Sequence, residues 1–364
     1  MESGIQPIFR PYQAGALSLR NRIVMAPMTR GRADDQRRAT PLMAEYYAQR
    51  ASAGLIITEG AAISEEAYGW QGSPGIYTSE HRRRWSSVAD AVQGRRGTIF
   101  MQLWHCGRAS HPDFQPNGLA PVAPSAIPIQ EGFARTPAGK KPWTTPRALT
   151  IDEIHRTVHD YRDAALRARD AGFDGVELHA ANGYLIDEFL RDGANKRTDD
   201  YGGSVANRAR FLLEICEAIS KSWEGQRLAV RLSPGITFNS MSDSDPEALF
   251  CFVAEKLNAF NLAYLHIYEP APGATSPIFN GQRLGPQIRS IFKGTIIRNG
   301  EFNAQSAAAM IQSGEADLVS FGRLFISNPD LPARFANNAS LQAADPRTFY
   351  TPGPAGYTDY PLLA

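Results

Sequence analysis

Cysteine is scarce in this sequence, and its spacing limits the chemistry that the chain can support. Only three cysteines occur, Cys106, Cys216 and Cys251, and no two of them form a CxxC pair. This pattern argues against a disulfide framework, a structural zinc site and a cysteine-ligated iron–sulfur cluster. We therefore expect no metal centre, and reduced thiols favour a cytoplasmic location.

The sequence also has almost no net charge and no long apolar run. The 38 Lys and Arg residues nearly balance the 37 Asp and Glu residues, so the formal charge is only +1. A nucleic acid or an anionic membrane would favour a larger positive charge. No apolar run reaches the roughly 18 residues of a membrane span, and the first residues lack the order of a signal peptide. We expect a cytoplasmic monomer or homodimer without nucleic-acid or membrane partners.

A regular alternation of short apolar runs and longer helical patterns fills most of the chain. The short runs are apolar at nearly every position, as expected of parallel strands that are buried on both faces. The eight predicted strands span residues 22–28, 54–58, 98–104, 175–179, 228–232, 263–268, 295–298 and 317–321. Eight strand–helix repeats with right-handed crossovers predict an α/β fold, the (β/α)8 TIM barrel.

Helical spacing is clearest over residues 150–171, where apolar residues recur every three or four positions. Thr150 and Glu153 form a capping box at its start, because the threonine oxygen can accept from a backbone N–H while the glutamate reaches back. Asp245 and Asn303 predict the starts of two further helices in the same way.

We expect a single domain over residues 1–364 with additions at two places. Residues 1–21 precede the first strand and are expected to cap the bottom of the barrel. Residues 112–148, dense in proline and glycine, follow the third strand, and so long a loop in a compact domain is usually functional. We expect this excursion to form a lid over the site, the alternative being an insertion without a role.

Polar residues stand at the ends of the predicted strands, where barrel enzymes carry their chemistry. Together with their neighbours, the strand-end residues are Pro27, Met28, Thr29, Arg30, Glu59, Gly60, Gln102, Trp104, His105, His179, Asn182, Arg231, Arg298, Asn299, Gly300, Gly322 and Arg323. Glycine-rich turns after the seventh and eighth strands often bind phosphate through backbone N–H groups and a cation. Because no GxGxxG or P-loop string occurs, the phosphate is expected to belong to a cofactor lying across the barrel mouth.

Arg231 stands inside an otherwise apolar predicted strand, residues 228–232. A charge in such a position must be paired or used, because desolvation of an isolated charge is costly. Arg231 is therefore a candidate functional cation, and a structural salt bridge to a neighbouring carboxylate is the alternative.

His179, Asn182 and Tyr184 stand within six residues directly after a buried strand. Asparagine is a poor metal ligand, whereas histidine and asparagine can both donate to an oxygen that becomes negative, and tyrosine can supply a proton. This grouping predicts polarisation of a carbonyl, the alternative being a core histidine bonded to a neighbour. Cys106 beside His105 suggests a thiol nucleophile as a weaker hypothesis.

Several motifs, in this order along the chain, give it a specific resemblance to a known family. They are NRIVMAPMTR at 21–30, ITEG at 57–60, QLWH at 102–105, HAANGYL at 179–185, NKRTDDYGGS at 195–204, NR at 207–208 and FGR at 321–323. With them the sequence, from about residue 8 to 360, resembles the Old Yellow Enzyme family of FMN-dependent ene-reductases.

The resemblance implies that FMN binds at the barrel mouth. Together with the strand ends, it predicts cofactor contacts from Pro27, Met28, Thr29, Gly60, Gln102, Arg231, Asn299, Gly300, Gly322 and Arg323. By similarity, Thr29 bonds the flavin C4 carbonyl, Gln102 holds the pyrimidine edge and Arg231 stands beside N1 and the C2 oxygen. Gly300, Gly322 and Arg323 match a phosphate cradle.

The resemblance also implies a reaction. NADPH or NADH would reduce the flavin and leave before an electron-poor alkene, an enone or a nitroalkene, enters. By similarity, His179 and Asn182 hold the carbonyl or nitro oxygen, flavin N5 gives a hydride to the β-carbon and Tyr184 protonates the α-carbon. Trp104, Phe349 and Tyr350 are expected to line the substrate cavity.

Two segments depart from the family pattern, and two other functions stay open. Residues 233–238 read SPGITF where relatives often carry an aromatic residue followed by glycine, and residues 126–148 match no familiar segment. Both lie near the expected rim, so substrate preference is not predicted. The alternatives are an FMN-containing isomerase or other redox-neutral enzyme, and a flavin-free barrel that acts as a lyase or binding protein.

Overall fold

The computed structural model describes residues 4–270 and 283–363. Its central feature is a closed barrel of eight strands, in which every neighbouring pair is parallel. In chain order the barrel strands are β3 (Ile23–Met25), β4 (Leu55–Ala62), β5 (Ile99–Trp104), β10 (Gly175–Ala180), β11 (Leu228–Leu232), β12 (Tyr264–Tyr268), β13 (Ile296–Asn299) and β14 (Leu318–Phe321). The predicted (β/α)8 fold is therefore confirmed.

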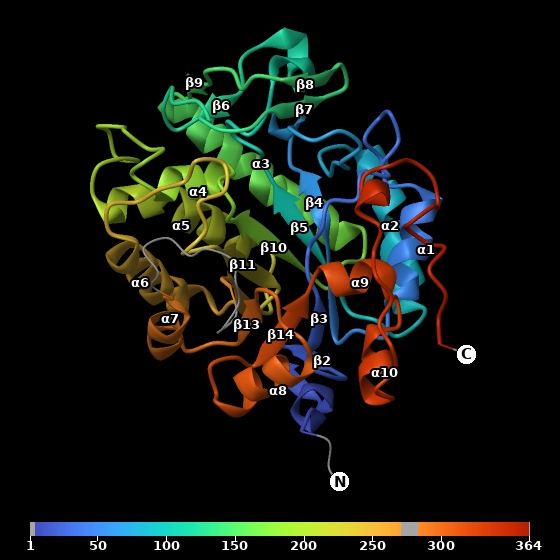
Figure 1. Ribbon diagram of the computed structural model, residues 1–364. Helices are drawn as coiled ribbons and strands as arrows, with labels where there is room; N and C mark the ends of the chain where they lie inside the picture. The colour runs from blue at the N-terminus through green and yellow to red at the C-terminus, as the bar shows by residue number, and fades with distance from the viewer. Residues whose placement is uncertain (1–3, 271–282, 364) are drawn as a thin grey trace.

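Helices follow the strands and surround the barrel (Figure 1). They are α1 (Pro41–Gln49), α2 (Ser79–Gln93), α3 (Ile151–Asp170), α4 (Leu185–Leu190), α5 (Val205–Ser222), α6 (Pro246–Leu257), α7 (Gly285–Ile291), α8 (Ala304–Gln312), α9 (Arg323–Ser327) and α10 (Leu331–Ala336). The predicted capping box of Thr150 and Glu153 starts α3, and the side chains of Asp245 and Asn303 cap α6 and α8. No helix in the described ranges has both the length and the apolar content to span a bilayer.

Two strand ends differ from the prediction by more than one residue, and both are next to candidate residues. Strand β3 ends at Met25, so Met28 and Thr29 lie in the loop beyond it. Strand β4 continues to Ala62, so Gly60 lies inside the strand. The cause is a register shift between Ile57 and Gly60, an irregularity that lengthens the strand and that sequence periodicity does not reveal.

The first residues form an antiparallel hairpin of β1 (Tyr12–Ala14) and β2 (Leu17–Leu19). Its apolar side chains share one hydrophobic cluster with residues near the starts of the barrel strands, including Val24, Leu55 and Tyr264. In Figure 1 the hairpin lies near the lower end of the barrel, toward which the N-terminus extends. Burial of this apolar surface fixes the position of the hairpin against the barrel interior.

The predicted excursion over residues 112–148 has secondary structure of its own. Strands β6 (Val122–Ala123) and β9 (Arg147–Ala148) pair in parallel, whereas β7 (Ala134–Thr136) and β8 (Gly139–Lys141) form an antiparallel hairpin. Figure 1 shows these strands at the top, beyond the carboxyl end of β5. The excursion therefore projects from the end of the barrel where the polar candidate residues stand.

Candidate active site

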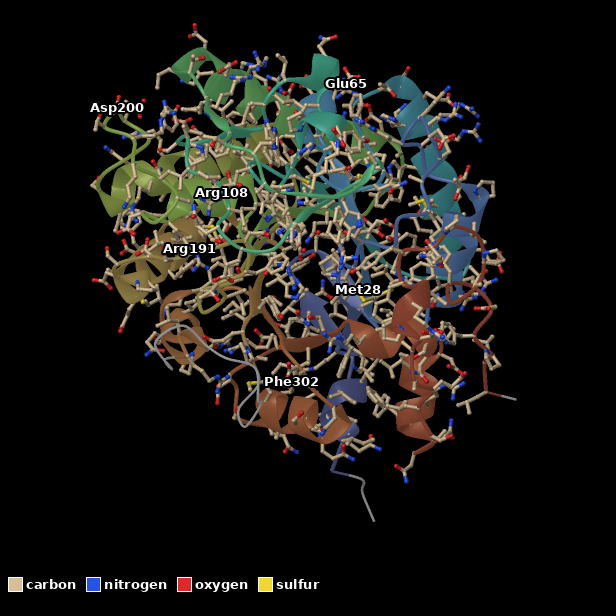
Figure 2. All side chains as sticks on the ribbon, turned by 45° about the horizontal axis from the view of Figure 1, so that its top comes forward. Met28, Glu65, Arg108, Arg191, Asp200 and Phe302 are labelled. Atoms are coloured by element: carbon tan, nitrogen blue, oxygen red, sulfur yellow. The ribbon has the colours of Figure 1, made fainter. Side chains whose placement is uncertain are left out.

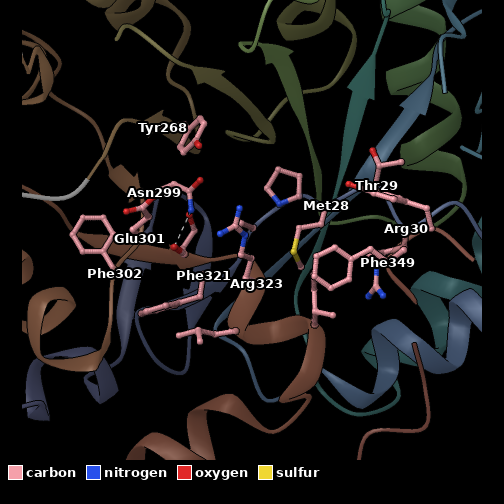
Figure 3. Close-up of a pocket in the computed structure, with 18 residues that line it drawn as sticks. Met28, Thr29, Arg30, Tyr268, Asn299, Glu301, Phe302, Phe321, Arg323 and Phe349 are labelled. Atoms are coloured by element: carbon pink, nitrogen blue, oxygen red, sulfur yellow. Dashed lines mark hydrogen bonds between the residues drawn. The ribbon is translucent and has the colours of Figure 1, made fainter. Parts of the chain in front are cut away.

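A cavity of about 500 Å³ opens among the loops after β3, β13 and β14. The predicted residues that line it are Pro27, Met28, Thr29, Asn299, Gly300, Gly322, Arg323, Phe349 and Tyr350. In Figure 3 the Arg323 side chain projects between Asn299 and Met28. Two arginines, Arg30 and Arg323, thus line the same space as an amide and apolar walls. Tyr268 and Ser320 also line the cavity, although the sequence analysis did not select them.

Local backbone geometry places the phosphate-site candidates at this cavity. Gly300 has a φ of 145°, and a Cβ there would collide with the carbonyl oxygen of Glu269, so only glycine fits. Gly322 caps the first turn of α9, which begins at Arg323. The backbone N–H of Ala26 donates to the Phe321 carbonyl at 3.0 Å and continues the β3–β14 pairing into the loop.

Two buried arginines position the aromatic wall of the cavity. Arg30 Nε donates to the Phe349 carbonyl oxygen at 3.2 Å, and Arg32 Nη1 donates to the same oxygen at 2.6 Å. Both side chains therefore hold the C-terminal segment against the loop after β3, which brings Phe349 and Tyr350 to the cavity. Figure 2 shows Met28, from the same loop, near the middle of the molecule.

His179, Asn182, Tyr184 and Trp104 form a second group that does not line this cavity. The Tyr184 ring packs edge-on against His179 with a centroid distance of 4.8 Å, and against Trp104 with a distance of 5.0 Å. Asn182 has a φ of 60°, and its backbone N–H donates to Ser233 Oγ at 2.8 Å. The turn after β10 is therefore held in a conformation that asparagine tolerates better than most residues.

Three polar atoms in this second group are buried and lack hydrogen-bond partners among the described residues. They are His179 Nδ1, Asn182 Oδ1 and Trp104 Nε1. Burial, together with Arg231 and His266, lowers the pKa of His179 well below its ordinary value, so the imidazole is neutral. Burial chiefly raises the pKa of the Tyr184 phenol, so it carries its proton at neutral pH. These atoms are free to form hydrogen bonds with a ligand.

Arg231 does not form the direct salt bridge that was the structural alternative. Its Nη2 donates to Asn299 Oδ1 at 2.8 Å, and its Nη1 contacts the His266 ring, 2.6 Å from Nε2. Asn299 lines the cavity, so Arg231 reaches the cavity wall through this amide. The guanidinium also lies over the Tyr268 ring at 5.3 Å.

Two buried charged or titratable residues on the barrel strands escaped the sequence analysis. Glu177 on β10 accepts from Gln102 Nε2 at 2.8 Å, and its other oxygen lies 2.8 Å from His266 Nδ1. Glu177 on β10 and His266 on β12 are the two residues, and each stands within an apolar strand, as Arg231 does. The same rule applied to every strand would have found them.

Gly60 lies inside β4 and packs against Trp104. A Cβ at Gly60 would lie 2.6 Å from the Trp104 ring, so glycine allows that indole to pack on β4.

Cys106 is buried, which raises the pKa of its thiol, while burial lowers the pKa of His105 to about 3. His105 Nδ1 accepts from the Gly107 backbone N–H, so this pair is not arranged as a nucleophile and its base.

A second cavity of about 790 Å³ adjoins the first and shares Tyr350 with it. The β7–β8 hairpin of the excursion contributes Arg135, Thr136 and Lys140 to its lining, and the loop after β4 contributes Trp70. The Trp70 and Tyr350 rings lie 5.2 Å apart between the two cavities. The excursion thus borders a space next to the site, whereas its action as a lid stays a prediction.

Comparison with known proteins gives a consistent result. The model of the NADH:flavin oxidoreductase / NADH oxidase family matches residues 7–342. The chain is 46% identical to 12-oxophytodienoate reductase 7 of Oryza sativa subsp. japonica over 98% of this chain and 95% of the relative.

Solved structures agree with the sequence comparison. The Old Yellow Enzyme homologue from Zymomonas mobilis superposes with a TM-score of 0.94 at 47% identity, covering 98% of this chain and 99% of that chain. Morphinone reductase in complex with tetrahydroNAD superposes with a TM-score of 0.92 at 46% identity, covering 98% of both chains. The protein therefore belongs to the NADH:flavin oxidoreductase / NADH oxidase family, that of Old Yellow Enzyme, and is an FMN-dependent oxidoreductase that uses a nicotinamide cofactor.

Proposed function

We propose that this protein uses NADPH or NADH to reduce the activated C=C bond of α,β-unsaturated carbonyl or nitro compounds. The observation that carries the proposal is the group formed by His179, Asn182 and Tyr184, in which buried polar atoms lack partners. Overall, the alkene gains a hydride and a proton while NAD(P)H becomes NAD(P)+. The named relatives, a 12-oxophytodienoate reductase and a morphinone reductase, support this class of reaction.

The residues at the barrel mouth fit FMN. The cavity volume of about 500 Å³ lies within the range of cofactor pockets, and Arg323 supplies a cation beside the turns at Gly300 and Gly322 for a phosphate. Met28 and Phe349 supply apolar walls. We assign the phosphate to the turns after β13 and β14, and the flavin ring to Pro27, Met28, Thr29, Gly60, Gln102 and Arg231. When bound, FMN supplies the hydride that the alkene receives.

The protein's own groups then stabilise the substrate as its oxygen gains negative charge. The imidazole of His179 and the amide of Asn182 each carry an N–H group that can donate to the carbonyl or nitro oxygen. Each such donor contributes roughly 2.7 to 4 kcal/mol to transition-state stabilisation. The protonated Tyr184 phenol supplies the proton for the α-carbon, which adds roughly 10²- to 10⁴-fold to the rate. Trp104, Phe349 and Tyr350 wall the substrate.

The test separates substrate binding from flavin binding. His179→Ala combined with Asn182→Ala is expected to weaken the binding of a simple phenol at least tenfold, while the protein keeps its FMN. Phenol titration followed by flavin absorbance measures both properties. The matched control is His159→Ala combined with Asn337→Ala, because both of these residues are exposed on helices away from the cavity. Wild-type phenol affinity in the first double variant would contradict the proposal.

Product analysis tests the reaction class itself. Under anaerobic conditions, 2-cyclohexenone with NADPH is expected to give cyclohexanone and one equivalent of oxidised nicotinamide. Conversion of an enone into an isomer without consumption of NADPH or NADH would instead favour the redox-neutral alternative. The cytoplasmic location and the oligomeric state stay predictions.

A further inference from the structure

A chain of hydrogen bonds crosses the barrel interior behind the candidate active site. It runs from the Glu177 carboxylate through the His266 imidazole to the Arg231 guanidinium. The side chains of Glu177 and His266 are completely buried, and Arg231 is only 5% exposed. They come from the adjacent strands β10, β11 and β12, so the barrel itself sets their spacing.

The chemistry of the three groups determines how the imidazole is oriented. Arg231 Nη1 lies 2.6 Å from His266 Nε2 and 3.0 Å from Nδ1; because arginine can only donate and the Glu177 carboxylate beside Nδ1 can only accept, we assign Nε2 as the acceptor. His266 Nδ1 therefore carries the proton and donates to Glu177 Oε2 at 2.8 Å. Ser320 Oγ lies 2.8 Å from Nε2, and its hydroxyl can act as donor or acceptor there. A protonated imidazole would direct an N–H at a guanidinium N–H, so His266 is held neutral.

Glu177 connects two candidate flavin contacts at once. Its Oε1 accepts from Gln102 Nε2 at 2.8 Å, while its Oε2 accepts from His266, which in turn accepts from Arg231. Gln102 uses its amide nitrogen in this hydrogen bond, so its amide oxygen is not bonded to Glu177. One carboxylate thus sets the direction of the Gln102 amide and, through one imidazole, that of the Arg231 guanidinium.

The arrangement also separates the two charges. No carboxylate lies within ion-pair distance of Arg231 anywhere in residues 4–270 and 283–363, since the neutral imidazole stands between Arg231 and Glu177. A direct ion pair would cancel most of the field of the guanidinium. An intervening imidazole lets the carboxylate offset the desolvation of Arg231 while the cation keeps a field toward the cavity side.

We propose that Glu177 and His266 are positioning residues that orient Gln102 and Arg231 and set the reduction potential of the bound flavin. The inference rests on the proposed function, because it requires FMN beside Arg231. Neither residue contacts the substrate group of His179, Asn182 and Tyr184 through any hydrogen bond of the described chain. The flavin potential therefore reports their role apart from substrate hydrogen bonding, and a purely structural role would leave that potential unchanged.

The test is the midpoint potential of the FMN-loaded Glu177→Gln variant. Reduced FMN carries negative charge, so loss of the buried carboxylate is expected to favour the reduced form on the order of tenfold. For a two-electron couple this fold-change corresponds to a rise of about 30 mV. Absorbance of the flavin during reductive titration against a reference dye measures the shift. An unchanged potential in a folded, FMN-replete variant would overturn the proposal.

Glu188→Gln is the matched control for a buried carboxyl group. Glu188 is completely buried in α4, and burial raises its pKa to about 8, so at pH 7 the substitution removes little charge. Its potential is expected to equal that of the wild type, and an equal rise in both variants would overturn the specific role of Glu177. A colourless wild-type protein that takes up no FMN would count against the proposed function instead.

His266 provides a second pair of variants in case Glu177→Gln fails to fold. Glutamine can accept from Arg231 with its oxygen and donate to Glu177 with its nitrogen, whereas leucine can do neither. His266→Gln is therefore expected to keep the wild-type potential, and His266→Leu to lower it and to weaken FMN binding about tenfold. Equal potentials and equal FMN affinities in these two variants would also overturn the proposal.

Discussion

Two arginines stand inside the strands of this barrel, and they are treated differently. Arg298 on β13 is fully buried and forms a direct ion pair with Glu269, whose Oε2 lies 2.7 Å from its Nη2. Arg231 on β11 is almost as buried, yet its nearest partners are the His266 ring and the Asn299 amide oxygen. Both positions satisfy the rule that a buried charge needs partners. The partner of Arg298 is a carboxylate, whereas the partners of Arg231 are neutral groups.

Under the proposed function, the difference separates a charge used for folding from a charge used for chemistry. A directly paired arginine contributes little field beyond its carboxylate, so Arg298 joins β13 to the end of β12 and does little else. An arginine with neutral partners keeps its field, and Asn299 connects that field to the cavity wall. The identity of the partner, rather than the burial of the arginine, therefore indicates which cation is functional.

The largest expected effect comes from breaking the direct pair. Arg298→Met removes the 2.7 Å partner of the buried Glu269 carboxylate and leaves Arg283, 3.7 Å away, as its remaining cation, so the free energy of unfolding is expected to fall by about 3 kcal/mol. Denaturant unfolding measures the loss. Adding Glu269→Gln should restore part of it, and the flavin potential of Arg298→Met should match that of the wild type. Wild-type stability in the single variant would refute the structural role.

Acid should affect the two arginines' surroundings differently, because only Arg231 depends on a titratable imidazole. Burial, reinforced by Arg231, lowers the pKa of His266 from 6.5 to about 4. Between these values the unfolded chain binds a proton that the folded protein does not, so stability present above pH 6.5 is lost as the pH falls toward 4. The loss attributable to His266 is about 3 kcal/mol.

Comparison with His266→Gln isolates this contribution from those of other buried histidines. The free energy of unfolding of the wild type, measured at intervals from pH 7 to pH 4, should fall more steeply than that of the variant. Parallel curves would show that His266 titrates alike in the folded and unfolded states. That result would contradict the orientation assigned to its ring.

Most of the fold was predictable because its causes are local. Residues 228–232 were predicted as a strand and form one with the same bounds, since a continuous apolar run between turns has few other structures. The extension of β4 to Ala62 was not predictable, because Thr58 Oγ1 accepts from the Gln102 backbone N–H across the register shift. That contact joins residues far apart in the sequence.

The candidate site was likewise predictable from the sequence only where its causes are local. Arg231 stood out because it interrupts an apolar strand, yet nothing in the sequence distinguished its partners from those of Arg298. The Glu177–His266 connection depends on the order of strands around a closed barrel, which brings β10, β11 and β12 side by side. Sequence motifs named candidate residues for the barrel mouth, and only the structure showed which of them bond to one another.

The smallest expected effect converts one arginine's environment into that of the other. Asn299→Asp places a carboxylate where the amide oxygen now lies, 2.8 Å from Arg231 Nη2, with almost no change of shape. Arg231 then has a direct ion pair, as Arg298 does. The field toward the cavity should weaken, and the reduced flavin should be disfavoured by a few-fold, less than the roughly tenfold shift expected for a whole unit charge.

The measurement is the midpoint potential with FMN in excess, so that weaker cofactor binding does not alter the result. Asn337→Asp adds the same charge to an exposed helix end and should leave the potential unchanged. A lowered potential for Asn299→Asp alone, opposite in sign to the rise expected for Glu177→Gln, would show that the net field of Arg231 reaches the flavin. A potential unaffected by either change would mean that neutral partners, like charged ones, serve only to satisfy a buried arginine.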